Sequence, residues 1–315
     1  MDMLHDKLFR TAEKYSDRVA ICSKSEEVTF EQFVNRIEYL AGALESLGFR
    51  KGDRVSILSQ NRMDYLTYHF ATSMIGVILH VMNTRLVIPE WLWAMNDAKS
   101  SALIVDETHA GAVPELKSGC PSLRFIAGIG SVDGADHATD RLIHSKERVR
   151  NQPPIFPEDP VLLIYTSGTT GLPKGCLQNQ QGSSTVDDLT ADIMDVTDRD
   201  VYMAMMPYFH QAGMIRSRAT MIRGGANVVP EALTIEEITD LMVEKKVTIT
   251  MLVSVGQGLV LVDKAVNEGM DFSTLRLIVS GGGMGARTMQ LLKVLCDTLQ
   301  CDSWESGGKP SARDR

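Results

Sequence analysis

Cysteine is sparse in this sequence, and no two cysteines stand in a C-x-x-C spacing. An odd number of scattered cysteines in a long chain excludes a small scaffold held together by disulfides. The pattern indicates reduced thiols and therefore a cytoplasmic protein. The 315 residues contain five cysteines: Cys22, Cys120, Cys176, Cys296 and Cys301.

The sequence also lacks a long apolar run and an excess of positive charge. Its most apolar stretch, residues 70–82, is interrupted by His80 and is shorter than the roughly 20 residues that span a bilayer. The first residues run directly into charged side chains, so we expect neither a signal peptide nor a transmembrane segment. With 32 Lys+Arg against 40 Asp+Glu, the net charge of −8 argues against nucleic acid as a partner.

Spacings typical of metal sites and hydrolases are missing as well. The seven histidines show no H-x-x-H or H-E-x-x-H spacing, and no G-x-S-x-G elbow occurs. An acidic run without a neighbouring histidine or cysteine is interpreted as a solvated face. We therefore predict no metal ligand in this chain. The acidic run comprises Asp187, Asp188, Asp192, Asp195, Asp198 and Asp200.

The remaining composition is that of an ordinary globular chain, with 44% hydrophobic and 23% charged residues. An amphipathic pattern predicts a helix from about Thr29 to Leu47, closed by Gly48 in a left-handed C-cap. Capping and periodicity predict further helices near Thr234 and over residues 286–299. Short apolar runs alternate with helical segments, which predicts an α/β fold of packed sheets flanked by helices. The runs cover residues 55–58, 102–105, 125–127, 161–165, 201–206, 227–229, 248–253 and 275–280.

Two composition shifts predict the domain organisation. Residues 131–160 are charged and rich in proline, so we interpret them as a surface linker between subdomains at about 1–150 and 151–300. Residues 301–315 have no periodicity and are rich in serine, glycine and charge, so we expect a disordered tail.

The most informative segment follows the apolar run at 161–165. It concentrates four adjacent hydroxyl side chains, three glycines and one lysine, which supply hydroxyl, backbone N–H and ammonium donors to a polyphosphate. It is not a Walker loop, because Lys174 is followed by Gly175. A flexible surface loop is the alternative. The donors are Thr166, Ser167, Gly168, Thr169, Thr170, Gly171, Lys174 and Gly175.

Residues 165–175 resemble the signature phosphate-binding loop of the adenylate-forming (AMP-binding) superfamily, which includes acyl-CoA synthetases. The resemblance extends over roughly residues 5–299 and implies a large N-terminal α/β domain that faces a small mobile C-terminal domain. The block at 206–213 is similar to the family's Pro-x-Phe-His-x-x-Gly segment, in which the histidine lies beside the acyl carboxylate. By this resemblance His210 and Lys174 are candidate catalytic residues, and His210 and Gly213 lie at the substrate.

The glycines after residue 280 resemble the family segment that lines the adenine and acyl pockets. The resemblance implies contacts of Gly281, Gly282 and Gly283 with the nucleotide. The apolar pocket segments at 203–206, 214–215 and 251–256 include Val253 and Ser254 as substrate residues and favour a hydrophobic acyl or aryl carboxylate.

The resemblance implies an ATP-dependent carboxylic acid–CoA ligase that uses ATP, Mg²⁺ and coenzyme A. A homodimer is also compatible with it. The family's Tyr-Gly-x-Thr-Glu and Thr-Gly-Asp motifs and its C-terminal domain are not found here, so we expect an incomplete domain with impaired activity. The alternative is a non-catalytic fragment or pseudoenzyme that binds nucleotide or acyl groups.

Overall fold

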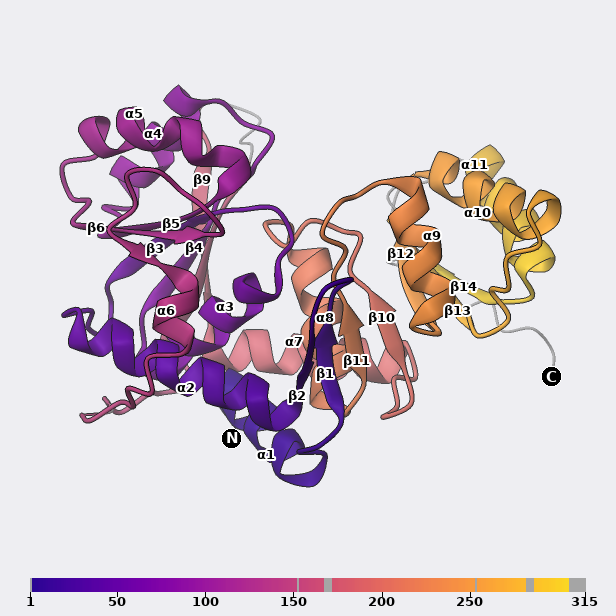
Figure 1. Ribbon diagram of the computed structural model, residues 1–315, viewed down its shortest axis with the longest axis horizontal. Helices are drawn as coiled ribbons and strands as arrows, with labels where there is room; N and C mark the ends of the chain where they lie inside the picture. The colour runs from indigo at the N-terminus through magenta and orange to yellow at the C-terminus, as the bar shows by residue number, and fades with distance from the viewer. Residues whose placement is uncertain (1, 152, 167–171, 253, 282–285, 306–315) are drawn as a thin grey trace. The chain divides into compact units, whose positions relative to one another are not determined.

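The computed structural model describes residues 2–151, 153–166, 172–252, 254–281 and 286–305. These residues form two compact units, each built around a seven-stranded sheet (Figure 1). The predicted α/β class of packed sheets flanked by helices is confirmed. Unit 1 comprises Met1–Ser16, Phe30–Val186 and Tyr208–Gln211, and unit 2 comprises Asp17–Thr29, Asp187–Pro207 and Ala212–Arg315.

The sheet of unit 1 has the strand order β7-β6-β5-β3-β4-β8-β9. All neighbours are parallel except β8 and β9, which form an antiparallel pair at one edge. The four strands β3 to β6 are almost wholly buried apolar segments, as expected of parallel strands covered on both faces. The strands are β3 (Arg54–Leu58), β4 (Ile78–Val81), β5 (Ala102–Asp106), β6 (Phe125–Ile129), β7 (His137–Ala138), β8 (Pro160–Thr166) and β9 (Lys174–Asn179).

Helices cover this sheet because one stripe of each is apolar. In α2 (Phe30–Ser46) the buried residues Phe33, Ile37 and Leu40 recur at helical spacing, and Gly48 follows with φ of 88°. The helix predicted from Thr29 is therefore confirmed. The others are α1 (Leu4–Lys14), α3 (Met63–Ile75), α4 (Ile88–Asp97), the 3₁₀ helix η1 (Glu107–Ala112), α5 (Val113–Gly119), α6 (Thr139–Ile143) and α7 (Gln180–Ile193), which continues into unit 2.

Unit 2 has the strand order β14-β13-β12-β10-β11-β1-β2, parallel except for β1 and β2. The side chain of Thr234 accepts a hydrogen bond from the Glu237 amide, and this N-cap starts α9, as predicted. The elements are β1 (Val19–Cys22), β2 (Glu27–Thr29), β10 (Val201–Met203), α8 (Gln211–Ile222), β11 (Ala226–Val228), α9 (Ile235–Glu244), β12 (Ile249–Leu252), α10 (Val255–Asn267), β13 (Leu277–Ser280), α11 (Ala286–Leu299) and β14 (Asp302–Glu305).

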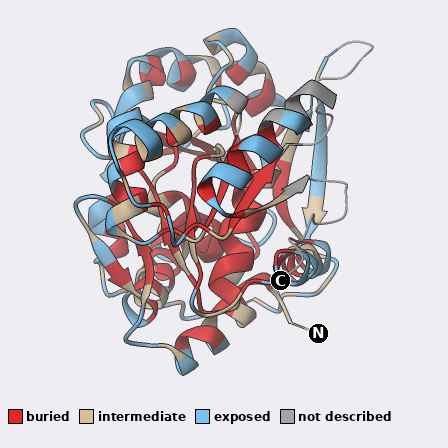
Figure 2. Ribbon diagram, turned by 90° about the vertical axis from the view of Figure 1, so that its right-hand side faces the viewer, coloured by how far each residue is buried: buried red, intermediate tan, exposed pale blue. Residues whose placement is uncertain are grey.

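Burial follows this layered construction. Most sheet strands lie in the interior, whereas many helices show one buried and one exposed side (Figure 2). A large apolar cluster in unit 2 joins Leu241, Leu261 and Leu292, which come from α9, α10 and α11. The core of unit 2 is thus shared by three separate helices.

The observed division differs from the predicted boundary near residue 150. Strands β8 and β9 lie beyond that boundary, yet β8 pairs with β4 and completes the sheet of unit 1. The expected linker also packs on unit 1, where Thr139 shares a 3.0 Å hydrogen bond with Tyr68 and the backbone of Arg148 covers Gly42. The segment at 131–160 therefore belongs to unit 1 and includes β7 and α6.

The predicted tail also differs at its start. Residues Asp302–Glu305 form β14, which pairs in parallel with β13 from Leu277↔Asp302 to Ser280↔Glu305. The buried Cys301 precedes this strand. The sequence pattern missed the strand because only four residues take part. Residues 306–315 lie outside the described part.

Candidate functional site

Strands β8 and β9 place three of the predicted phosphate-binding residues together. Their antiparallel register sets Thr166 opposite Lys174 and Tyr165 opposite Gly175. Thr166, Lys174 and Gly175 are exposed, so a hydroxyl and an ammonium group stand side by side at the accessible end of the strand pair. The other predicted residues of this loop, at 167–171, lie outside the described residues.

Tyr165, next to Thr166 on β8, anchors this strand pair. Its hydroxyl donates a 2.6 Å hydrogen bond to Oδ2 of Asp97, the last residue of α4. Its ring meets the rings of His80 and Trp93 edge-on, with centroids 5.0 and 5.5 Å apart. A Cβ on Gly175 would lie 3.3 Å from Cε1 of Tyr165, so the glycine permits close approach of the ring. Tyr165 therefore ties both strands to α4.

Tyr165 and its neighbour His80 are both uncharged at neutral pH. Burial, followed by the hydrogen bond and negative charge of Asp97, raises the pKa of Tyr165, so its hydroxyl remains a donor at neutral pH. Burial lowers the pKa of His80 to about 3, although Asp97 opposes the shift. Nδ1 of this neutral imidazole lies 2.8 Å from Oγ of Ser56, which in turn lies 2.6 Å from Oγ of Ser100. This cluster of His80, Ser56 and Ser100 has a structural role beside β8, which pairs with the strand that carries His80.

His210 lies in unit 1, directly before α8, and is exposed. The backbone amide of Tyr208 donates a 2.7 Å hydrogen bond to Oδ1 of Asn61, and Gln178 of β9 donates to Oε1 of Gln211. His210 therefore belongs to the same unit as Thr166 and Lys174. The geometry assigns both the candidate carboxylate residue and the candidate phosphate residues to one unit.

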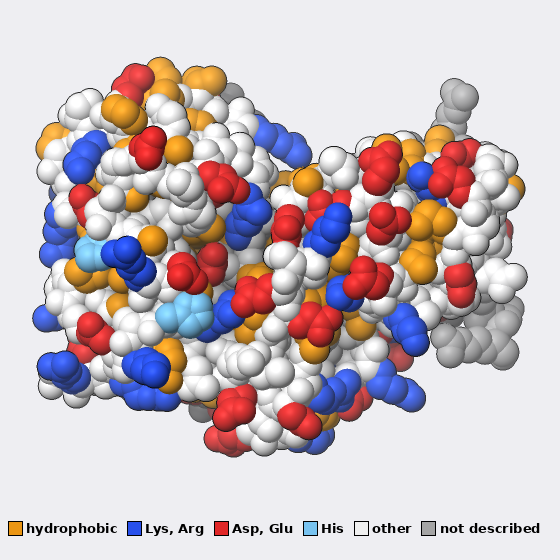
Figure 3. Space-filling view, in the orientation of Figure 1, with side chains coloured by type: hydrophobic (Ala, Val, Ile, Leu, Met, Phe, Trp, Pro, Cys, Tyr) orange, Lys and Arg blue, Asp and Glu red, His pale blue; other side chains and the backbone are white. Residues whose placement is uncertain are grey.

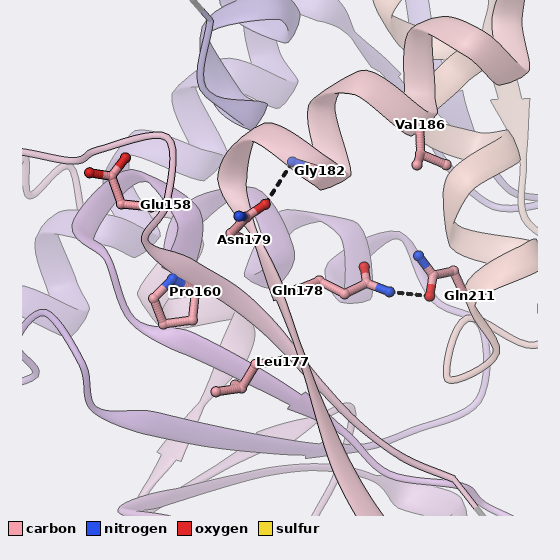
Figure 4. Close-up of a pocket in the computed structure, with 8 residues that line it drawn as sticks. All are labelled: Glu158, Pro160, Leu177, Gln178, Asn179, Gly182, Val186 and Gln211. Carbon is pink, nitrogen blue, oxygen red and sulfur yellow. Dashed lines mark hydrogen bonds between the residues drawn. The ribbon is translucent and has the colours of Figure 1, made fainter.

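A pocket of about 540 Å³ adjoins the His210 segment (Figure 4). Its size falls in the usual range for small-molecule sites. Gln178 and Gln211 are joined by their hydrogen bond, while Asn179 accepts a 2.7 Å bond from the Gly182 amide near the start of α7. The lining combines amide groups with apolar surface and consists of Glu158, Pro160, Leu177, Gln178, Asn179, Gly182, Val186 and Gln211.

The remaining predicted site residues belong to unit 2. Ser254 and Gly281 follow β12 and β13, whose parallel register pairs Leu252 with Ser280, so both lie at the carboxyl ends of adjacent strands. Such an edge is where ligands bind in open α/β sheets. Val253, Gly282 and Gly283 lie outside the described residues.

Gly213 has a packing reason to be glycine. It is buried in α8, and a Cβ there would lie 2.5 Å from the carbonyl oxygen of Met206 and 2.6 Å from that of Pro207. Backbone atoms cannot move aside as a flexible side chain would. The close helix–backbone contact therefore accounts for this glycine without a ligand.

The acidic run interpreted as a solvated face is partly buried, which corrects that interpretation. Asp187 forms a buried bidentate pair with Arg218, with Nε–Oδ2 and Nη2–Oδ1 distances of 2.8 Å. Asp200 is also buried, and although burial alone would raise its pKa, hydrogen bonds from Arg276, Thr197 and Thr248 lower it. Both carboxylates are structural partners of arginines.

Metal-ligand clusters and membrane-spanning helices are absent from the described residues. No cluster of three or more histidine, cysteine, aspartate or glutamate residues there has the geometry of a metal site. None of the helices in that part is both long and apolar enough to cross a membrane. On the face seen in Figure 3, acidic and basic side chains are interspersed. All five cysteines are free.

The residues that support the candidate site residues through hydrogen bonds could not be identified from the sequence. Tyr165 was visible within the phosphate-loop motif, but its partner Asp97 lies 68 residues earlier. Asn61 and Gln178 carried no signal of their contacts with residues 208 and 211, because nothing in a single sequence pairs such distant amides.

The chain resembles curated CoA ligases. It is 26% identical over 265 residues to an indoleacetate–CoA ligase of Aromatoleum aromaticum, covering 84% of this chain and 52% of that protein. It is 28% identical over 288 residues to a 2-succinylbenzoate–CoA ligase of Bacillus cereus, covering 90% and 54%. The chain thus spans about half the length of these relatives.

Solved structures share the fold. An anthranilate CoA ligase in complex with anthranoyl-AMP superposes with a TM-score of 0.83 at 23% identity, covering 96% of this chain and 59% of that one. A Mycobacterium tuberculosis fatty acyl CoA synthetase superposes with the same TM-score at 20% identity, covering 96% and 58%. The sequence pattern of the AMP-binding enzyme family matches residues 8–301. The chain therefore belongs to the AMP-binding enzyme family, as its phosphate-loop and histidine motifs predicted.

Proposed function

We propose that this chain is the nucleotide- and carboxylate-binding part of an ATP-dependent carboxylic acid–CoA ligase. The observation that carries the proposal is the assignment of Thr166, Lys174 and His210 to one compact unit. The named CoA ligases among the relatives support the same reaction class. Free cysteines support a reducing, cytoplasmic location, and a homodimer stays a prediction.

In the proposed reaction, a carboxylate oxygen of the acid attacks the α-phosphorus of MgATP and pyrophosphate leaves. The product is an acyl-adenylate. A thiolate of coenzyme A then attacks the acyl carbonyl, and AMP leaves. Both partners in the first step are anions, so donors that hold them together lower the barrier. Thr166, Lys174 and Gly175 would donate to the phosphates, and Ser254 and Gly281 would border the substrates.

His210 would orient the acid and stabilise its charge. It has no proton to remove, since a carboxylic acid with a pKa near 4 is already ionised at neutral pH. The adjacent pocket would accept the body of the acid, because Gln211 both follows His210 and lines the cavity. Its mixed lining accommodates a mainly apolar acyl or aryl group.

The test is adenylate formation by this chain. MgATP is mixed with indoleacetate, 2-succinylbenzoate, 4-hydroxybutyrate or decanoate, and pyrophosphate release and hydroxylamine-trapped acyl-adenylate are measured. We expect pyrophosphate release from MgATP with at least one of these acids. Lys174→Ala should weaken MgATP binding about tenfold through loss of a charged phosphate contact. The matched variant Lys24→Ala, at an exposed lysine of unit 2, should bind MgATP as the wild type does.

A second candidate function is binding without catalysis. The chain is also a candidate nucleotide- or acyl-binding protein without turnover. MgATP binding without pyrophosphate release would favour that function. Absence of both binding and turnover would contradict both.

A further inference from the structure

The chain enters unit 1 for only four residues between two long stretches of unit 2. Tyr208–Gln211 belong to unit 1, whereas Asp187–Pro207 and Ala212–Arg315 belong to unit 2. His210 is the third residue of this excursion. Most of the excursion precedes α8, so side-chain and amide contacts must set its position.

Tyr208 is the first anchor of the excursion. Its backbone amide donates a 2.7 Å hydrogen bond to Oδ1 of Asn61, and both residues are buried. Its ring centroid lies 5.5 Å from that of Tyr65, a fully buried residue in the first turn of α3. The backbone and ring are therefore both held two residues before His210.

Gln211 is the second anchor, on the other side of the histidine. Its side-chain oxygen accepts a hydrogen bond from Gln178, which lies on the same strand as Lys174. The two anchors, at residues 208 and 211, lie on either side of His210, which is itself exposed. A rigid support of this kind reduces the freedom that a catalytic group must lose when it meets its substrate.

We propose that Asn61 and Tyr65 are positioning residues for His210, acting through the amide and ring of Tyr208. The inference rests on the proposed function, in which His210 meets the carboxylate. Neither residue would touch a reacting atom. Their loss would weaken carboxylate binding and leave the phosphate-binding residues on β8 and β9 in place.

The first experiment uses Asn61→Ala in the full chain. Deleting the acceptor leaves the buried Tyr208 amide without its hydrogen bond, a loss that corresponds to about tenfold or more in an equilibrium. We expect hydrogen exchange of that amide to rise about tenfold. Affinity for decanoate or phenylacetate in the presence of MgATP should fall by a similar factor, while affinity for MgATP alone should stay within twofold of wild type, since Thr166 and Lys174 are untouched.

A tyrosine pair tests the ring contact separately and does not depend on the folding of Asn61→Ala. The Tyr65 hydroxyl is buried and has no hydrogen-bond partner within the described residues, so Tyr65→Phe should keep wild-type carboxylate affinity. Tyr65→Leu removes the ring and should weaken carboxylate binding. The matched control is Asn83→Ala. Asn83 also accepts a hydrogen bond from a backbone amide, that of Arg85 at 2.9 Å, but lies outside this segment.

The outcomes separate this inference from the proposed function. If wild type binds MgATP and carboxylate but Asn61→Ala and Tyr65→Leu change neither carboxylate affinity nor Tyr208 exchange, the positioning role is overturned. Equal losses of MgATP and carboxylate affinity also overturn it, because they indicate general destabilisation. If wild type binds neither ligand, the proposed function fails. In that case, hydrogen exchange of the Tyr208 amide still tests whether Asn61 anchors it. Faster exchange in Asn61→Ala than in the other variants supports the anchor, and unchanged exchange refutes it.

Discussion

The hydroxyl of Tyr165 donates a 2.6 Å hydrogen bond to Asp97, while the ring of the same tyrosine lies over Gly175 on the neighbouring strand. One side chain thus links α4 to both strands that carry the candidate phosphate-binding residues Thr166 and Lys174. The contact explains how an exposed edge pair of strands presents its donors in a defined register.

Removing this tyrosine should weaken nucleotide binding in two steps. Tyr165→Phe loses only the hydrogen bond to Asp97, which corresponds to a decrease of about threefold in MgATP affinity. Tyr165→Ala also loses the ring contacts with His80, Trp93 and Gly175, so the decrease should reach about tenfold. Calorimetric titration with MgATP measures both. The control Tyr68→Phe deletes a hydroxyl bound to Thr139 elsewhere in unit 1 and should have no effect; an equal loss there would contradict the assignment.

The buried pair of Asp187 and Arg218 should respond asymmetrically to substitution. Asp187→Ala leaves a buried guanidinium without its counter-charge and should lower the free energy of unfolding by about 3–5 kcal/mol. The double variant Asp187→Leu/Arg218→Met removes both charges and should recover most of that loss. Urea denaturation compares them. Asp192→Ala, which breaks a more exposed contact with Arg223, should cost less than about 1 kcal/mol, and a similar cost for Asp187→Ala would refute the prediction.

Buried His80 should make stability depend on pH. Burial lowers its pKa to about 3 in the folded protein, whereas the unfolded chain takes up this proton below about pH 6.5. The unfolded state binds more protons between these values, so stability is complete above pH 6.5 and falls toward pH 3, by up to about 1.4 kcal/mol per pH unit from this group.

His80→Gln should therefore flatten the stability profile between pH 7 and pH 5, measured as urea midpoints at unit intervals. Some slope should remain, because burial also lowers the pKa of His5. His144→Gln, at an exposed site, should keep the wild-type slope. A steep profile in His80→Gln would show that another group controls acid stability.

Gly213→Ala should destabilise the protein through a steric clash. The added methyl group would approach the carbonyl oxygens of Met206 and Pro207 to about 2.5 Å, a cost of roughly 1–3 kcal/mol for an overpacked site. Thermal unfolding measures the loss. Gly111→Ala meets no atom within 4 Å and should unfold near the wild-type temperature. An unchanged unfolding temperature for Gly213→Ala would leave ligand contact as the reason for glycine.

Local patterns predicted elements whose signals are contiguous. Helices α2 and α11 begin and end, and α9 begins, close to the residues expected from capping and apolar periodicity. All eight predicted apolar runs contain a strand, because an uninterrupted apolar segment between turns suits a sheet covered on both faces. The same reasoning missed β9, whose six residues are mostly exposed and lack an apolar pattern.

Pairing over long distances could not be predicted in this way. Strand β1 joins β11 through Ile21↔Asn227, and β4 joins β8 through Leu79↔Leu162. No local rule states which strands will meet, so the boundary proposed at residue 150 cut through the sheet of unit 1. Asp187 and Asp188 show the same difficulty. They are adjacent on one helix, yet Asp187 pairs with a buried arginine whereas Asp188 lies at the surface.

The sequence by itself determined the family and predicted the candidate phosphate-binding loop, because both depend on residue types at short spacing. Only the tertiary structure decided what supports them. The Tyr165–Asp97 bond, the anchoring of Tyr208 by Asn61 and the packing of Gly213 all join distant segments or depend on close backbone approach. Such contacts arise from the path of the folded chain, which brings together residues that no sequence spacing connects.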